Sequence, residues 1–163
     1  MEAGFPPPQQ SEDERFMRRA LELAAGAAAA GEIPVGAVVV CGGEIVAEAG
    51  NRKEANQDPL GHAEILAIRA ASEKLGRWRL SGCTLYVTLE PCTMCSGAII
   101  HARLDRVVYG ATDPKAGAVR SLYQILNDER LNHAPEVLSG VLEAETSTQL
   151  KLFFRELRQR IKT

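Results

Sequence analysis

Two short stretches of this chain carry side chains that could together hold a metal ion. Cys92 and Cys95 lie three residues apart directly after Pro91, a spacing that places two thiolates one helical turn from each other. Thiolates at this spacing can both reach one tetrahedral Zn²⁺. Upstream, His62 offers a third ligand, and Glu64 follows it two residues later. Three protein ligands leave the fourth zinc position open, which is typical of a catalytic site rather than a structural one.

Glu64 is the expected proton carrier of this site. Two thiolates cancel the 2+ charge of zinc, so we expect the metal to acidify its water less than an all-histidine site would. Glu64 would accept the water proton, pass it to a ring nitrogen of the substrate and help an amine to depart. His62 and Glu64 can converge only if His62 lies at the irregular entrance of a helix. The backbone N–H of Ala63 or Cys92 would stabilise the developing charge.

Each of these residues also has a simpler interpretation. A C-x-x-C pair alone is redox-active or structural about half of the time, and a thioredoxin-like dithiol would also follow a strand and begin a helix. Neither alternative gives the histidine or the glutamate a role. A structural zinc site would need a fourth ligand, but the spare cysteines, Cys41 and Cys83, lie in or beside predicted strands and are expected to fill the core. His101 lies roughly 9 Å further along the predicted helix than the second cysteine, so His62 is the better ligand.

The composition narrows the class of protein and its surroundings. The chain has 163 residues and a formal net charge of −2, with a pI of about 6.0, which predicts one domain that is not a general nucleic-acid binder. Contact with nucleic acid must then come from a local patch. The longest apolar stretches are too short to span a bilayer, and no signal peptide is visible, so we expect no membrane association. Four cysteines without a secretory context predict reduced thiols and a cytoplasmic location.

The order of predicted elements indicates an α/β fold. Residues 1–10, with three consecutive prolines, predict a flexible tail, and residues 11–163 predict a single domain in which Ser11 and Glu14 form a capping box. Alternation of strand, helix and strand over residues 84–109 predicts a parallel pair with a right-handed crossover. The predicted helices cover residues 11–30, 62–75, 91–102 and 143–160, with a helical turn at 122–126, and the predicted strands cover residues 35–41, 44–49, 84–89, 106–109 and 137–141.

From residue 32 to about residue 160 the chain resembles the bacterial tRNA adenosine deaminases, which convert the wobble adenosine of an anticodon to inosine. The resemblance implies the cytidine-deaminase fold, a three-layer α/β architecture with a mixed five-stranded sheet flanked by helices. By position, it also implies that His62, Cys92 and Cys95 bind one zinc ion per subunit and that Glu64 shuttles protons. The matching stretches are residues 32–38, 50–52, 62–64, 85–95, 97–98, 100–101, 106–111, 132–133 and 153–155.

The same resemblance implies residues that bind the substrate. Asn51, in Gly-Asn-Arg, would hydrogen-bond the flipped base. Ala63 is a predicted substrate contact through its backbone N–H, independently of the resemblance. Asp113 falls where the family contacts the nucleotide near the target. Ala134 stands where the family often has arginine, and Arg120 is a candidate to replace that RNA contact.

The implied partners are a tRNA anticodon stem-loop and a second copy of the chain in a homodimer, with no DNA. The predicted C-terminal helix offers independent support, because it carries an apolar face beside a basic stripe that would suit a phosphate backbone, although a basic stripe is as often a solvated helix face. The alternative functions are a deaminase of free bases or nucleosides, such as guanine or cytosine, and a zinc-binding or thiol-redox module. The apolar face comprises Leu150, Phe153, Phe154, Leu157 and Ile161, and the basic stripe comprises Lys151, Arg155, Arg158 and Lys162.

Overall fold

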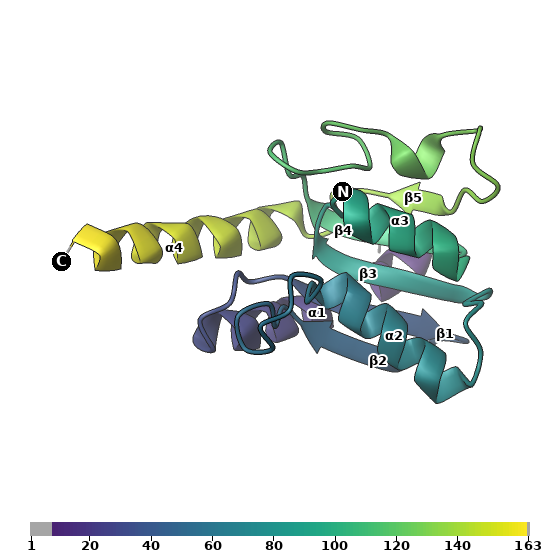
Figure 1. Cartoon of the computed structure of the whole chain (residues 1–163), viewed down its shortest axis with the longest axis horizontal. Coiled ribbons are helices and arrows are strands. Elements are labelled where there is room, and N and C mark those ends of the chain that lie inside the picture. The colour runs from purple at the N-terminus through teal and green to yellow at the C-terminus, as the bar shows by residue number, and fades with distance from the viewer. Residues whose placement is uncertain (1–7, 163) are drawn as a thin grey trace, which may run out of the picture.

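A mixed five-stranded sheet forms the middle layer of the computed structural model, which describes residues 8–162 (Figure 1). The strand order is β2-β1-β3-β4-β5; β1 runs antiparallel to β2 and β3, whereas β3, β4 and β5 are mutually parallel. The elements are α1 (Pro8–Ala29), β1 (Gly36–Cys41), β2 (Glu44–Gly50), α2 (Ala63–Leu75), β3 (Cys83–Leu89), α3 (Thr93–Ala102), β4 (Arg106–Ala111), the 3₁₀ turn η1 (Ile125–Asn127), β5 (Glu136–Leu138) and α4 (Glu143–Lys162).

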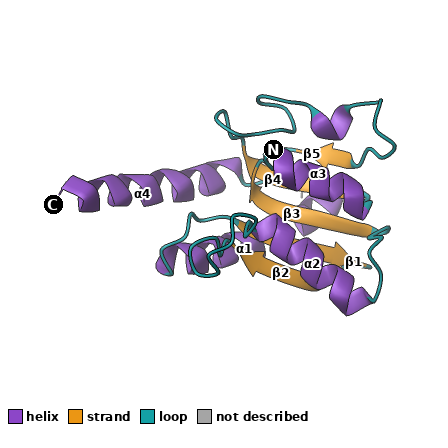
Figure 2. Cartoon of the chain, in the orientation of Figure 1, coloured by secondary structure: helices purple, strands orange, loops and turns teal. Residues whose placement is uncertain are grey.

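The sheet is covered on both faces, as the continuous apolar sequence of β1 predicts. Val38 and Val40 point to one face and pack with Phe16 of α1, whereas Val39 points to the other face and joins the core under α2 and α3. Figure 2 shows this layering, with α2 and α3 lying together on the same side of the sheet. The predicted parallel pair is confirmed, because β3 and β4 are parallel and are joined through α3.

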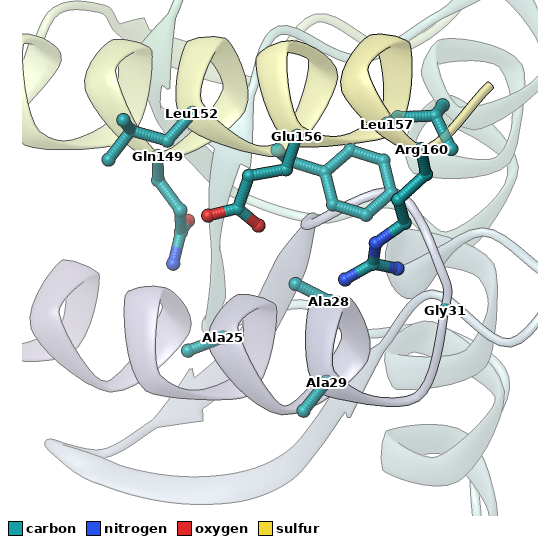
Figure 3. Close-up of a pocket in the computed structure, with 10 residues that line it drawn as sticks. Ala25, Ala28, Ala29, Gly31, Gln149, Leu152, Glu156, Leu157 and Arg160 are labelled. Atoms are coloured by element: carbon teal, nitrogen blue, oxygen red, sulfur yellow. The ribbon is translucent and has the colours of Figure 1, made fainter. Parts of the chain in front are cut away.

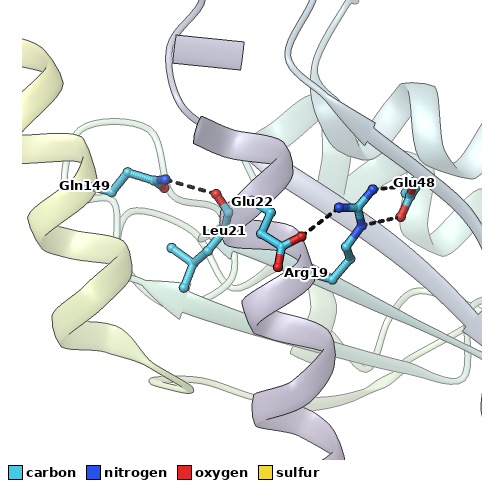
Figure 4. A network of polar contacts seen from close by, with 5 residues as sticks. All are labelled: Arg19, Leu21, Glu22, Glu48 and Gln149. Atoms are coloured by element: carbon cyan, nitrogen blue, oxygen red, sulfur yellow. Dashed lines mark hydrogen bonds and ion pairs between the residues drawn. The ribbon is translucent and has the colours of Figure 1, made fainter. Parts of the chain in front are cut away.

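Helix α1 is attached to the sheet by polar contacts as well as by its apolar face. The buried Asp13 accepts two hydrogen bonds from the Arg106 guanidinium of β4 and one from the Tyr86 hydroxyl of β3. At the β2 edge of the sheet, the Arg19 guanidinium donates two hydrogen bonds to the Glu48 carboxylate (Figure 4). These ion pairs orient α1 across strands from both halves of the sheet.

The start of α1 differs from the prediction. The helix begins at Pro8, three residues before Ser11, so Ser11 lies within the helix and the predicted capping box is wrong. Proline is tolerated in a first turn because the N–H that it lacks would have no partner there. Residues 1–7 lie outside the described residues, and the flexible tail predicted for them stays a prediction.

Helix α4 begins against the sheet and then extends away from it (Figure 1). Gln149, in its second turn, donates a hydrogen bond to the Leu21 carbonyl of α1 at 3.0 Å (Figure 4). The predicted helix is confirmed, but its apolar face is largely uncovered by the described residues, since Phe154, Leu157 and Ile161 are 37%, 38% and 76% exposed. A cavity of about 500 Å³ lies between α1 and α4 (Figure 3).

The boundaries of β5 and of the 3₁₀ turn also differ from the predictions. The last strand is β5 at Glu136–Leu138, shorter than the predicted 137–141, and the predicted helical turn at 122–126 is the 3₁₀ turn at Ile125–Asn127. The chain turns at Gly140, whose φ of +79° lies in the left-handed region that ends a strand. No described helix has the length and apolar character that a membrane span requires.

Gly36 is a position where β1 lies directly against the backbone of α1, and this close approach generates a stability prediction. A Cβ at Gly36 would overlap the backbone of Ala20 and Ala24, so we expect Gly36→Ala to lower the free energy of unfolding by about 1–3 kcal/mol or more. The matched control is Gly26→Ala within α1, where an added Cβ meets no atom within 4 Å and a gain of about 0.5–1 kcal/mol is expected. Urea unfolding measures both; equal midpoints for the two variants would contradict the close approach.

Candidate metal centre

The three predicted zinc ligands lie where α2 and α3 begin. His62 is the N-cap of α2, with an extended φ of −75° and ψ of 147°, and Cys92 is the N-cap of α3, with φ −77° and ψ −177°. Cys95 lies in the first turn of α3. The predicted irregular entrance at His62 is therefore confirmed. Pro91, predicted to begin the second helix, instead precedes the N-cap, because α3 begins at Thr93.

The ligand atoms have separations that suit zinc. The Nδ1 atom of His62 lies 3.6 Å from the Sγ of Cys92 and 3.5 Å from the Sγ of Cys95, and all three atoms lie within 4.8 Å of one another. Tetrahedral zinc with ordinary Zn–S and Zn–N bond lengths would hold nitrogen and sulfur about 3.6 Å apart. One imidazole and two thiolates are also the donor set that favours zinc. The residues present therefore fit a zinc ion with one position left open.

The electrostatics of the cluster favour negative charge on Cys92. A hydrogen bond from the Cys95 thiol and one from the His62 ring, against the cost of burial, lower the pKa of Cys92 to about 4. The hydrogen bond with Cys92 raises the pKa of His62 above its usual value. The N-terminal end of α3 also favours a thiolate at this position.

Glu64 lies directly beside the ligands, in the first turn of α2. It is 4% exposed, and interaction with Cys95 partly opposes the effect of burial on its pKa. Burial is the largest influence on Glu64 and raises its pKa above the usual value for glutamate. A buried carboxyl of raised pKa can both accept and return a proton, as the predicted role requires.

Asn51 connects the loop after β2 to the metal ligands. Its Oδ1 accepts a hydrogen bond from the Ala63 N–H at 2.8 Å, and its Nδ2 donates to the Ile33 carbonyl at 3.2 Å. Asn51 therefore holds the first residue of α2, next to His62. The Ala63 N–H, predicted to face the substrate, is engaged by Asn51 in this structure, and the substrate-binding roles of both residues stay predictions.

Asp113 lies in the loop after β4, on the other side of Ile33. It is half-buried and lines a cavity of about 800 Å³ together with Ile33 and Phe154. Asn51 lines a neighbouring cavity of about 340 Å³ that shares Ile33 and Phe154 with the first. The exposed Ile33 side chain thus stands between the two predicted substrate residues, and its role was not predicted from sequence.

Two buried carboxylates were also not assigned a role from sequence. Glu32 accepts hydrogen bonds from the backbone N–H groups of Glu54 and Ala55 and so holds the loop that follows Asn51. Glu90 accepts hydrogen bonds from the loop that follows β4. The only sequence signal for either residue is a charged side chain set among apolar residues at the end of a buried segment.

The other histidine and cysteines considered as metal ligands lie in different parts of the fold. His101 is exposed in the last turn of α3, which supports the choice of His62. Cys41 and Cys83 face each other across β1 and β3, and burial raises the pKa of Cys83 to about 11, as expected for a core thiol. Arg120 donates a hydrogen bond to the Ser139 hydroxyl.

A mixed sheet with a His-Cys-Cys centre at two helix N-termini and a buried glutamate beside it is the architecture of a zinc-dependent deaminase. Residues 10–111 match the family described as the cytidine and deoxycytidylate deaminase zinc-binding region, and the chain belongs to this family. The predicted cytidine-deaminase-like fold is confirmed by similarity to a solved structure. That structure, from biochemical and structural studies of A-to-I editing by tRNA:A34 deaminases, gives a TM-score of 0.81 at 48% identity and covers 83% of this chain and 99% of its own.

Curated relatives are similar over almost the whole chain. A tRNA-specific adenosine deaminase of Bacillus subtilis is 51% identical over 152 residues, which cover 93% of this chain and 94% of the relative. One of Haemophilus influenzae is 50% identical over 148 residues, covering 90% and 86%. A guanine deaminase from Nitrosomonas europaea is a more distant structural neighbour, with 25% identity, a TM-score of 0.76 and coverage of 94% and 95%.

The site geometry predicts that binding of zinc and catalysis can be separated. Glu64→Gln should retain one zinc per chain, because the three ligands are untouched, while deaminase activity falls on the order of 10²- to 10⁴-fold through loss of the proton carrier. Cys95→Ser is the contrasting variant and should lose both zinc and activity. Elemental analysis and a product assay on the same samples measure both quantities. Full activity in Glu64→Gln would contradict the assigned role.

Proposed function

We propose that this protein hydrolyses adenosine to inosine and ammonia at the wobble position of a tRNA anticodon. The observation that carries the proposal is the buried Glu64 set against a three-ligand zinc centre, in a chain about half identical over nearly its full length to tRNA-specific adenosine deaminases. A target base must leave its stack to reach such a centre, and the bases of an anticodon loop are accessible in this way.

The residues of the centre divide the chemistry between them. His62, Cys92 and Cys95 would hold zinc, which when bound supplies Lewis-acid activation of a water molecule. Glu64 accepts a proton from the attacking water and delivers it to a ring nitrogen of adenine. The ionised carboxylate then takes the remaining proton from the newly added hydroxyl group and delivers it to the amino group as the C–N bond breaks, so that water and adenosine give inosine and ammonia.

Asn51 and Asp113 suit recognition of the nucleotide from opposite sides of Ile33. Asn51 uses one N–H on the Ile33 carbonyl, and its second N–H remains to donate to an acceptor on the base. Asp113 lines the cavity beside it, at the position where the family contacts a nucleotide next to the target. The exposed Ile33 offers an apolar surface against which a base can pack.

A basic wall continues this cavity along α4. Lys115 of the Asp113 loop and the exposed Lys151, Arg155 and Arg158 of α4 line the same cavity. Three of the four residues of the predicted basic stripe therefore line the same cavity as Asp113. On a chain whose net charge is −2, this local cluster is the surface that suits an RNA backbone.

The function is tested with an anticodon stem-loop that carries a wobble adenosine. Zinc-loaded protein should convert this adenosine to inosine and leave the same stem-loop with wobble guanosine or cytidine unchanged, measured by nucleoside analysis after digestion. Free guanine, cytosine and adenosine form the parallel panel for the alternative function. Efficient turnover of a free base with no inosine in the stem-loop would reverse the assignment.

The basic wall predicts a change in the salt dependence of binding. Arg155→Ala combined with Arg158→Ala should weaken binding of the stem-loop and lower the slope of log affinity against log salt by about one to two, one for each phosphate that the variant no longer neutralises. Arg18→Ala combined with Arg69→Ala, exposed arginines on α1 and α2, removes the same charge elsewhere and is the matched control. Equal slopes for the two pairs would exclude α4 from the RNA path.

We also propose a homodimer in the cytoplasm. Apolar side chains are exposed near the site, with Leu122 52% and Tyr123 57% exposed in the segment that follows the Asp113 loop, and a second copy would cover them. All four cysteines are free thiols, which suits a reducing compartment. Sedimentation should give twice the chain mass of 17.6 kDa, and Leu122→Lys combined with Tyr123→Lys should give the mass of one chain. A single-chain mass for the unmodified protein would exclude the homodimer.

A further inference from the structure

Glu90 is the last residue before the Pro-Cys pair that supplies the metal ligand Cys92. It follows β3 directly and is 2% exposed. A buried carboxylate is costly unless its oxygens accept hydrogen bonds, so the groups that face Glu90 show what holds it in place.

Both carboxylate oxygens of Glu90 accept hydrogen bonds from the loop that follows β4. Oε1 accepts from the backbone N–H of Asp113 at 3.0 Å and from the Ser121 hydroxyl. Oε2 accepts from three consecutive backbone N–H groups, those of Val119, Arg120 and Ser121, at 3.2, 2.9 and 3.0 Å.

The loop of residues 113–121 packs closely against the Glu90 carboxylate. Gly117 is buried against Glu90, and a Cβ there would overlap both the carboxylate and the Asp113 carbonyl. The next residue, Ala118, donates its N–H to the Pro91 carbonyl at 2.8 Å. Residues 113–121 are therefore attached to positions 90 and 91, which lie two residues and one residue before the metal ligand Cys92.

Asp113 is rigidly placed within this loop. Its Oδ1 accepts hydrogen bonds from the backbone N–H of Lys115 and Ala116, and its carbonyl accepts one from Gly117 at 2.8 Å. Because the loop closes on itself, moving its attachment at Glu90 would move Asp113 as part of a unit.

We propose that Glu90 is a positioning residue that sets the place of the Asp113 loop relative to the metal centre and thereby the binding of the nucleotide next to the target. One carboxylate joins the segment that binds the metal to the segment that lines the nucleotide cavity. The proposal rests on the proposed function for the identity of the substrate. The attachment of the loop through Glu90 is testable without catalysis.

The test uses Glu90→Gln, which keeps the size of the side chain. The single amide oxygen can serve the three N–H groups from Val119 to Ser121, and the amide NH₂ then faces the Asp113 N–H, donor against donor. We expect hydrogen exchange at the Asp113 amide to accelerate, zinc to remain at one per chain, and the KM for the stem-loop to rise on the order of 10-fold with kcat within about twofold. Ser121→Ala is the control, since it removes the hydroxyl bond but keeps all four N–H bonds.

A second variant applies the same displacement from the loop side. Gly117→Ala adds a methyl group that overlaps the Glu90 carboxylate, so it should also raise the KM for the stem-loop. This variant tests the proposal even if Glu90→Gln does not fold. The control for the added methyl group is Gly26→Ala, where the new Cβ lies in open space on α1. Wild-type KM and wild-type Asp113 exchange in both variants would overturn the proposal. Loss of zinc in parallel with activity would overturn it as well, because Glu90 would then act on the metal centre. Absence of inosine with the unmodified protein would instead contradict the proposed function, and the exchange measurement would still decide the role of Glu90.

Discussion

The meeting of two helix N-termini is the constraint on which this structure depends. His62 and Cys92 are thirty residues apart in sequence, yet their ligand atoms must lie 3.6 Å apart. This requires α2 and α3 to lie on one face of the sheet with their first residues adjacent. The fully buried face of α2 consists of small residues, Ala63, Ala67 and Ala71, which allow the helix to approach the sheet closely. The parallel pairing of β3 and β4 then directs the loop after β4 to the same edge.

Three buried carboxylates lie around the metal centre or hold the loops beside it. Glu64 lies beside the metal ligands and is the proposed proton carrier, while Glu32 and Glu90 each accept hydrogen bonds from backbone N–H groups of a loop that carries a predicted substrate residue. The difference lies in what surrounds them. Several N–H donors lower the pKa of Glu90, whereas burial dominates at Glu64 and raises its pKa above the usual value for glutamate.

Helix α4 carries the basic surface that we propose to contact the RNA. Its basic residues and Phe154 line the same cavity as Asp113, so an element more than fifty residues beyond Cys92 contributes to the proposed nucleotide cavity. The same helix is attached to α1 near its start, through Gln149, and is largely exposed beyond that point. A site built partly from such a helix combines a rigid centre with a polar, extended approach, as suits a long RNA ligand.

The sequence by itself determined the centre and most of the elements. The identities of His62, Glu64, Cys92 and Cys95 and the buried strand of β1 follow from short-range spacing and apolar pattern, which local structure preserves. The sequence did not predict the start of α1 at Pro8. A capping pattern at Ser11 and a proline at position 8 are both acceptable helix starts, and local pattern alone does not choose between them.

Only the tertiary structure decided which polar groups face one another. The acceptors of Asn51 and Glu90 bind N–H groups 12 to 31 residues away, a pairing that no local pattern records. Helix α4 is a second example. Its apolar and basic faces follow from the periodicity of its sequence, but the cavity that they line depends on where the helix lies relative to the sheet. Local sequence spacing identifies side chains that are capable of metal binding and proton transfer. Long-range packing determines their neighbours, and the burial and hydrogen-bond partners that result set the pKa and the position of each group.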